Sequence, residues 1–145
     1  MLEGVFEPVG DWGLLILRVG LGIIFLVHGW PKLNPNSPMK GPAGFVGFLR
    51  QLEVPLPALL GWVVILLETA GAVLLVLGVA TRIIALGLAI DMLAAIRLVK
   101  RGMAKARFME LQASGWEFEF ALMVAALALL FTGPGAIALP FLAGW

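Results

Sequence analysis

Four long apolar stretches constrain this chain most, because each is long enough to cross a lipid bilayer as a helix. They lie at about 12–30, 57–79, 82–99 and 116–132. About 20 helical residues, at about 1.5 Å each, span a hydrocarbon core of about 30 Å. The composition agrees, since 61% of the residues are hydrophobic and only 13% are charged. The sequence therefore predicts an all-α fold, with residues 1–145 forming one four-transmembrane-helix bundle.

The two longer connections are expected to lie at the membrane surface. The proline-rich segment from Pro31 to Pro42 predicts that the first helix ends before it. Pro42 suits a first helical turn, and apolar residues follow at helical spacing at Phe45, Phe48, Leu49 and Leu52. Residues 100–115 also mix charged and apolar residues in a helix-compatible pattern. We therefore expect short interfacial helices in the 1–2 and 3–4 loops.

The distribution of basic residues predicts the orientation in the membrane. Arg82 lies near the short connection between the second and third stretches, and the two tails carry no Lys or Arg. The long loops hold most of the others: Lys32, Lys40, Arg50, Lys100, Arg101, Lys105 and Arg107, with Arg97 beside them. By the positive-inside rule, both long loops are expected in the cytoplasm and both termini outside.

Ionisable residues within or next to the apolar stretches are the candidate site. A charged side chain at the bilayer centre costs at least about 2.5 kcal/mol, so such residues usually face one another or a wet cavity and mark function. The candidate ligand-binding cluster consists of Arg18, His28, Lys32, Glu68, Asp91 and Glu119. No catalytic residue can be named from this set.

Helix geometry suggests how the cluster divides. Arg18 and Lys32 share a face of the first helix with Gly22 and Gly29, small residues that allow a neighbouring helix to approach closely. Counting residues along straight helices places Glu68 and Asp91 near the midplane and Arg18 a few ångströms to the outer side, so Arg18 is expected to group with one of them. The same counting places His28, Lys32, Arg97 and Glu119 together near the cytoplasmic side. The alternative to a binding pocket is a set of structural ion pairs that fix helix register.

The composition also limits the cofactors. The chain has no cysteine, which excludes disulfides and thiolate-bound iron–sulfur or zinc sites within it. Its one histidine cannot ligate a haem from both faces. A carboxylate-plus-histidine metal site is disfavoured by the spread of these residues in depth, so no metal ligands are predicted. No intrinsic cofactor is expected.

Five segments of the sequence resemble the DoxX family of bacterial four-helix membrane proteins. They are LLILRVGLGIIFLVHGWPKL (14–33), GFVGFLRQLEVPLP (44–57), VVILLETAGAVLLVLGVATRIIAL (63–86), DMLAAI (91–96) and EFALMVAALALLFTGPG (119–135). Within them, Arg18, His28, Lys32, Glu68 and Glu119 fall on the family's polar positions. Many members carry a Ser-Leu-Asp-like signature after the final Gly-Pro-Gly, and this chain has Ala136 to Pro140 there instead.

The resemblance implies a location and a functional setting. It implies the bacterial inner membrane and a link to membrane redox systems, since the family takes its name from subunits of a thiosulfate:quinone oxidoreductase. The first hypothesis is an accessory subunit of such a system that binds a quinone or similar lipophilic ligand in the charged pocket. The chain has no redox centre of its own, so whether it is itself an enzyme stays open.

Two other functions stay open from the sequence. One is a non-catalytic scaffold or assembly factor for another membrane protein, and the other, less favoured, is a small transporter, which would require an oligomer. The expected partners are membrane lipid, a quinone, a partner redox protein and further copies of this chain. Nucleic acid is not expected, because the net charge is only +1.

Overall fold

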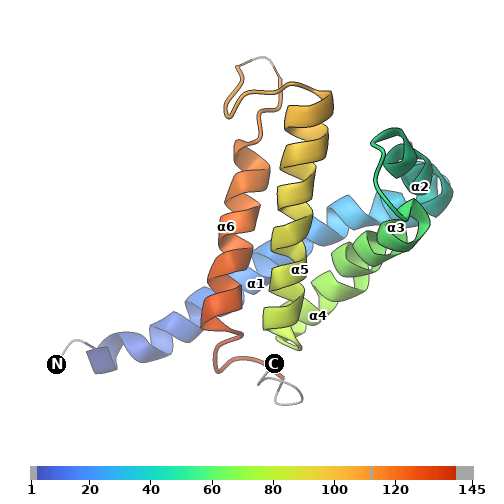
Figure 1. The fold of residues 1–145 in the computed structure, drawn as a ribbon. Helices are drawn as coiled ribbons and strands as arrows, with labels where there is room; N and C mark the ends of the chain where they lie inside the picture. The colour runs from blue at the N-terminus through green and yellow to red at the C-terminus, as the bar shows by residue number, and fades with distance from the viewer. Residues whose placement is uncertain (1–2, 112, 140–145) are drawn as a thin grey trace.

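The computed structural model describes residues 3–111 and 113–139, and every regular element in these residues is a helix (Figure 1). The longer helices form four rods, two of which are made of consecutive helical segments, and the short α2 lies between the first rod and the second. In chain order the elements are α1 (Glu3–Leu33), the short α2 (Gly41–Gln51), α3 (Pro57–Leu66) continued by η1 (Leu67–Gly71) and α4 (Ala72–Leu77), α5 (Thr81–Ala94) continued by η2 (Ala95–Met103), and α6 (Glu117–Thr132). The all-helical prediction is confirmed for this part of the chain.

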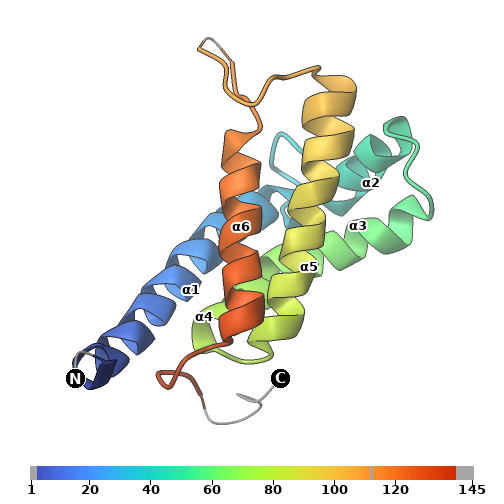
Figure 2. The same cartoon turned by 60° about the vertical axis from the view of Figure 1, so that its left-hand side comes forward.

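The rods form two layers that cross at an angle (Figures 1 and 2). In one layer α5 and α6 run antiparallel side by side, and in the other α1 lies along the α3–η1–α4 rod. The main core lies where the layers meet, and its members include Phe25 of α1, Leu75 of α4, Leu88 of α5 and Leu129 of α6. Because the layers cross, they diverge away from this core, and α2 covers part of the opening at one end.

The α3–η1–α4 rod contains one turn of π-helix at its middle. The wider turn covers Leu67–Gly71, and the Thr69 hydroxyl donates to the Ile65 carbonyl at 2.6 Å. Serine and threonine that bond back to the preceding turn compete with the regular helical ladder, and single π-turns occur frequently at functional sites. Glu68 lies in this turn.

The first helix continues past Pro31, contrary to the prediction that it ends there. It runs to Leu33, and the Asn34 amide donates to the Trp30 carbonyl at 2.9 Å. Proline removes one backbone donor, but here less than one turn of helix remains beyond it, so the remaining bonds suffice. As a result Lys32 is held on a helix face rather than in a loop.

The helix predicted to start at Pro42 is confirmed as α2, which has a proline in its first turn and buries Phe45 and Leu49. The prediction of a second surface helix in residues 100–115 is wrong for the described residues. There η2 ends at Met103 and the chain then folds back irregularly. The Trp116 and Glu117 amides both donate to the Phe108 carbonyl at 3.0 Å, and this turn replaces helical bonding.

In the part of the chain that the structure describes, two helical stretches are long and apolar enough, by length and composition, to cross a membrane: Val9–Leu33 and Pro57–Leu77. The other two rods do not meet this test: basic residues break the apolar sequence near the end of the α5–η2 rod, and α6 is only 16 residues long. All four rods nevertheless present large apolar side chains outward, among them Ile16, Ile23, Trp62, Leu66, Ile83, Ile90, Val124 and Phe131.

Candidate functional site

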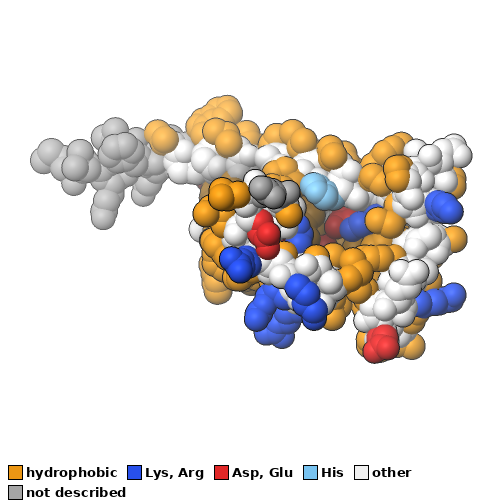
Figure 3. Space-filling view, turned by 90° about the horizontal axis from the view of Figure 1, so that it is seen from above, with side chains coloured by type: hydrophobic (Ala, Val, Ile, Leu, Met, Phe, Trp, Pro, Cys, Tyr) orange, Lys and Arg blue, Asp and Glu red, His pale blue; other side chains and the backbone are white. Residues whose placement is uncertain are grey.

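A cavity of about 500 Å³ lies between the two layers, at the end of the molecule where α2 lies. Its walls come from α1, α2, α3, η1, α5, η2 and α6, and apart from Gly87 they are apolar except at five ionisable side chains: His28, Lys32, Glu68, Asp91 and Glu119. Figure 3 shows the hollow beside the histidine, with acidic and basic atoms inside it. Five of the six candidate residues thus share one chamber.

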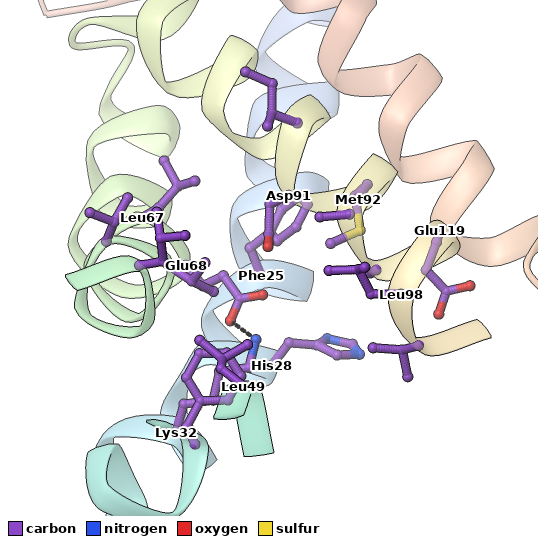
Figure 4. Close-up of a pocket in the computed structure, with 18 of the residues that line it drawn as sticks. Phe25, His28, Lys32, Leu49, Leu67, Glu68, Asp91, Met92, Leu98 and Glu119 are labelled. Carbon is purple, nitrogen blue, oxygen red and sulfur yellow. Dashed lines mark hydrogen bonds and ion pairs between the residues drawn. The ribbon is translucent and has the colours of Figure 1, made fainter. Parts of the chain in front are cut away.

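Lys32 and Glu68 form an ion pair inside this chamber (Figure 4). The Glu68 side chain is 2% exposed and that of Lys32 16% exposed, so the pair is largely removed from solvent. The Lys32 ammonium also lies 4.7 Å from the centre of the Phe45 ring, a cation–π contact with α2. In an apolar setting such a pair tolerates burial only because each charge has the other.

Gly29 allows the two helices that carry this pair to approach each other. A Cβ atom at Gly29 would lie 2.8 Å from the Glu68 Cβ and 2.9 Å from its carbonyl oxygen. At Gly22, a Cβ would lie 3.0 Å from the Ala72 carbonyl oxygen. The prediction that these glycines permit close helix approach is confirmed.

Asp91 and Glu119 enter the chamber from the other layer, on α5 and α6. Glu119 pairs with Lys100 at 3.2 Å, while its second oxygen, Oε2, is buried without a hydrogen-bond partner among the described residues. Oδ2 of Asp91 is likewise buried without a hydrogen-bond partner among the described residues. Figure 4 shows the Asp91 carboxylate above the Lys32–Glu68 pair. Buried polar groups are almost always satisfied, so these two oxygens mark places where a ligand or water would bind.

His28 lies at the rim of the chamber. Its Nδ1 is 2.8 Å from the Ile24 carbonyl oxygen, one turn earlier in α1. Its ring lies against Phe118 of α6, with the ring centres 6.1 Å apart. The side chain therefore joins the two layers at the point where the chamber meets the surface.

Arg18 lies away from the chamber, so the prediction that it groups with Glu68 or Asp91 is wrong. It is fully buried and donates to the carbonyl oxygens of Val76, at 3.1 Å, and Ile137. Depth counting assumed parallel helices, whereas the layers cross, and Lys32 rather than Arg18 reaches Glu68. Arg18 instead attaches the segment after α6 to the far end of α4.

Arg97 also does not join the group in which depth counting placed it. It lies by a separate shallow hollow with Gln51 and Glu53. Sequence reasoning missed Lys100 as the partner of Glu119, because the fold-back of residues 104–115 was not recognised. It also missed the α2 residues Phe45 and Leu49 as chamber walls, although their spacing already marked the apolar face of a helix. Among the described residues, no three His, Cys, Asp or Glu side chains gather closely enough to hold a metal ion.

Comparisons with known proteins place the chain among membrane proteins. The DoxX family model matches residues 13–101. A Bacillus subtilis (strain 168) protein named "Putative oxidoreductase CatD" is 37% identical over 130 residues, which cover 89% of this chain and 86% of that protein. An Escherichia coli (strain K12) protein named "Inner membrane protein YphA" is 36% identical over 69 residues, 48% of this chain and 45% of that protein. No solved structure matches.

Proposed function

The chain belongs to the DoxX family of membrane proteins, and from this premise we propose that it binds a quinone or similar lipophilic molecule in the chamber. A single observation carries the proposal. Ionisable side chains from four helical rods gather in an apolar cavity of about 500 Å³, within the size range of about 300–1,000 Å³ that is typical of small-molecule sites. The Phe25, Phe45 and Phe118 side chains in its wall suit a flat ring, and the polar groups suit its oxygen atoms.

In this proposal the protein is an accessory subunit of a membrane redox system. The relative named as an oxidoreductase, similar over most of its length, supports a redox setting. The chain holds no cysteine and, in its described part, no metal-binding group of side chains. In the proposal, electrons pass through the bound molecule and a partner redox protein.

We also propose that all four rods cross the bacterial inner membrane. The α5–η2 rod, Thr81–Met103, contains enough residues for about 30 Å of hydrocarbon, and α6 with its flanking residues nearly so. The outward apolar side chains of every rod suit lipid. The relative named as an inner membrane protein supports this location. The basic loops then lie in the cytoplasm and the termini outside, with further copies of the chain as neighbours in the membrane.

The test is to identify what the protein holds. The full chain is purified into lipid nanodiscs, its bound small molecules are extracted, and mass spectrometry quantifies quinones against empty nanodiscs. We expect a quinone in near-stoichiometric amount in the wild type and its loss in Glu68→Gln. Arg18→Gln is the control, because Arg18 lies outside the chamber and should retain the ligand.

Two results would contradict the proposal. The wild type could carry no quinone above the lipid background, or Glu68→Gln could lose thermal stability while keeping every ligand. The second result would mean that the charges serve helix register, which favours the alternative that the chain is a scaffold for another membrane protein.

A further inference from the structure

The chamber reaches the outer surface of the protein where side chains of its wall are themselves exposed. Among the described residues this occurs at two places. The first lies between α1 and α6, at His28 and Phe118, whose ring centres are 6.1 Å apart. The second lies between α3 and the α5–η2 rod, and its exposed wall residues are Leu60, Val63, Ile90 and Leu98. We call this second opening the aliphatic mouth, because these four side chains are all aliphatic.

The aliphatic mouth has defined ends. At one end α5 packs closely on η1, since a Cβ atom at Gly87 would lie 3.0 Å from the Leu67 Cδ1. From this contact the two rods diverge (Figures 1 and 2). At the other end Leu98 also lines the shallow hollow that contains Arg97. The mouth is therefore a side opening along the rods, and polar groups begin where its aliphatic side chains end.

The outer surface beside the mouth is apolar as well. Trp62 and Leu66 of α3 are exposed there, and so are Leu86 and Leu93 of α5. Extended apolar surface of this kind marks a site of contact with lipid or another apolar partner. With the rods crossing the membrane as proposed, the aliphatic mouth opens into hydrocarbon.

We propose that the chamber takes an amphiphile through this mouth: its polar ring lies beside the Lys32–Glu68 pair and Asp91, and its flexible apolar tail passes between α3 and the α5–η2 rod into the lipid. The inference rests on the proposed function and deepens it. It names the class of ligand, a ring that carries a long tail, and it assigns the path of that tail.

The physical basis is the surroundings that each opening offers to a chain of methylene groups. Along the aliphatic mouth such a chain contacts apolar side chains from the chamber to the surface, so it never meets water. At the other opening it would pass the polar ring of His28. A tail in lipid is already in apolar surroundings, so the mouth adds little affinity. It decides where the tail lies, and position is what the experiment must measure.

The first experiment narrows the mouth with a large side chain, in the full chain in nanodiscs. The variants are Val63→Trp and Ile90→Trp, one on each side of the opening. Two probes share one ring: decylubiquinone carries a ten-carbon tail, and ubiquinone-0 carries none. Bound probe is measured by chromatography over a range of concentrations, with empty nanodiscs as baseline. We expect each variant to weaken decylubiquinone binding at least about tenfold and to leave ubiquinone-0 unchanged.

The chain offers matched controls for both variants. Val124 of α6 is 48% exposed, against 50% for Val63, and lies outside the chamber wall. Ile83 is 64% exposed, against 58% for Ile90, and lies about two turns earlier in α5, also outside the wall. Val124→Trp and Ile83→Trp therefore add the same bulk to the lipid-facing surface. Both controls should bind the two probes as the wild type does.

The second experiment needs no variant, so it stands even if a tryptophan variant does not fold. A ubiquinone analogue with a photoreactive diazirine midway along its tail is bound to the wild type and irradiated. Mass spectrometry of peptides then locates the label. We expect it on residues 60–66 and 90–98, on the two sides of the mouth, in excess over other exposed apolar residues.

Each outcome decides. Selective loss of decylubiquinone in Val63→Trp and Ile90→Trp, with label concentrated at the mouth, supports the inference. Binding of both probes as in the wild type, equal weakening of both, label beside His28 and Phe118, or label spread evenly over the lipid-facing surface overturns it and leaves the proposed function intact. Retention of neither probe by the wild type overturns the proposed function and this inference together.

Discussion

Removing Lys32 should destabilise the protein more than removing its partner Glu68. In Lys32→Met, the Glu68 carboxylate stays in a side chain that is 2% exposed and has lost its cation. Breaking a buried pair from one side costs about 3–5 kcal/mol, and we expect a loss of that size in the free energy of unfolding.

The opposite variant, Glu68→Leu, should cost less. The Lys32 side chain is 16% exposed and lies in the last turn of α1, so its flexible stem can carry the ammonium toward the interface. The double variant replaces the pair by apolar groups of similar volume and should be close to the wild type or more stable. The coupling between the two sites is then at least about 3 kcal/mol.

The assay is equilibrium unfolding in mixed micelles by titration with dodecyl sulfate, followed by the fluorescence of the five tryptophans. Lys40→Met serves as the control, since Lys40 is exposed and the change should stay within about 0.5 kcal/mol. A Lys32→Met variant within about 1 kcal/mol of the wild type, or a double variant equal to the sum of the singles, would refute the reasoning.

Three further changes probe other contacts. Gly29→Ala should lose about 1–3 kcal/mol in the same titration, because its Cβ would overlap Glu68, whereas Gly20→Ala, with nothing within 4 Å, should cost nothing; equal effects would count against close helix approach. Arg18→Met should speed amide hydrogen exchange in residues 136–139, measured by mass spectrometry, because a carbonyl there loses its donor; unchanged exchange would show that Arg18 does not hold this segment. Lys100→Met should cost less than about 1 kcal/mol, since its ion pair with Glu119 is partly solvated, and a larger loss would mean the pair matters more than its exposure indicates.

The helices were predictable from local signals. Apolar length, Pro42 at a helix start and the spacing of Phe45 and Leu49 all act within a few turns of chain, and the helices lie where these signals put them. Two local signals misled. Pro31 did not end α1, because a proline so near the end of a helix disturbs few bonds. The amphipathic pattern of residues 100–115 did not form a helix beyond Met103, because backbone bonds to Phe108 turn the chain back.

The pairing of charges was much less predictable. The ionisable residues within or next to the apolar stretches were visible in the sequence, and five of these six candidates line one chamber. Their partners were not visible, because a partner depends on the crossing angle between helices. Straight, parallel rods would bring Arg18 to Glu68. The crossing layers instead bring Lys32 there and leave Arg18 with backbone carbonyls.

The sequence by itself therefore determined that this chain is helical and mostly apolar, and that a few positions within its helices are polar. Hydropathy and helix periodicity are properties of neighbouring residues, so they can be read without the fold. Only the tertiary structure decided that Lys32 pairs with Glu68, that Gly29 lets their helices touch, and that Asp91, Glu119 and His28 line one cavity. The physical reason is that ion pairing and hydrogen bonding act over a few ångströms, and such distances between remote residues exist only once the rods have packed.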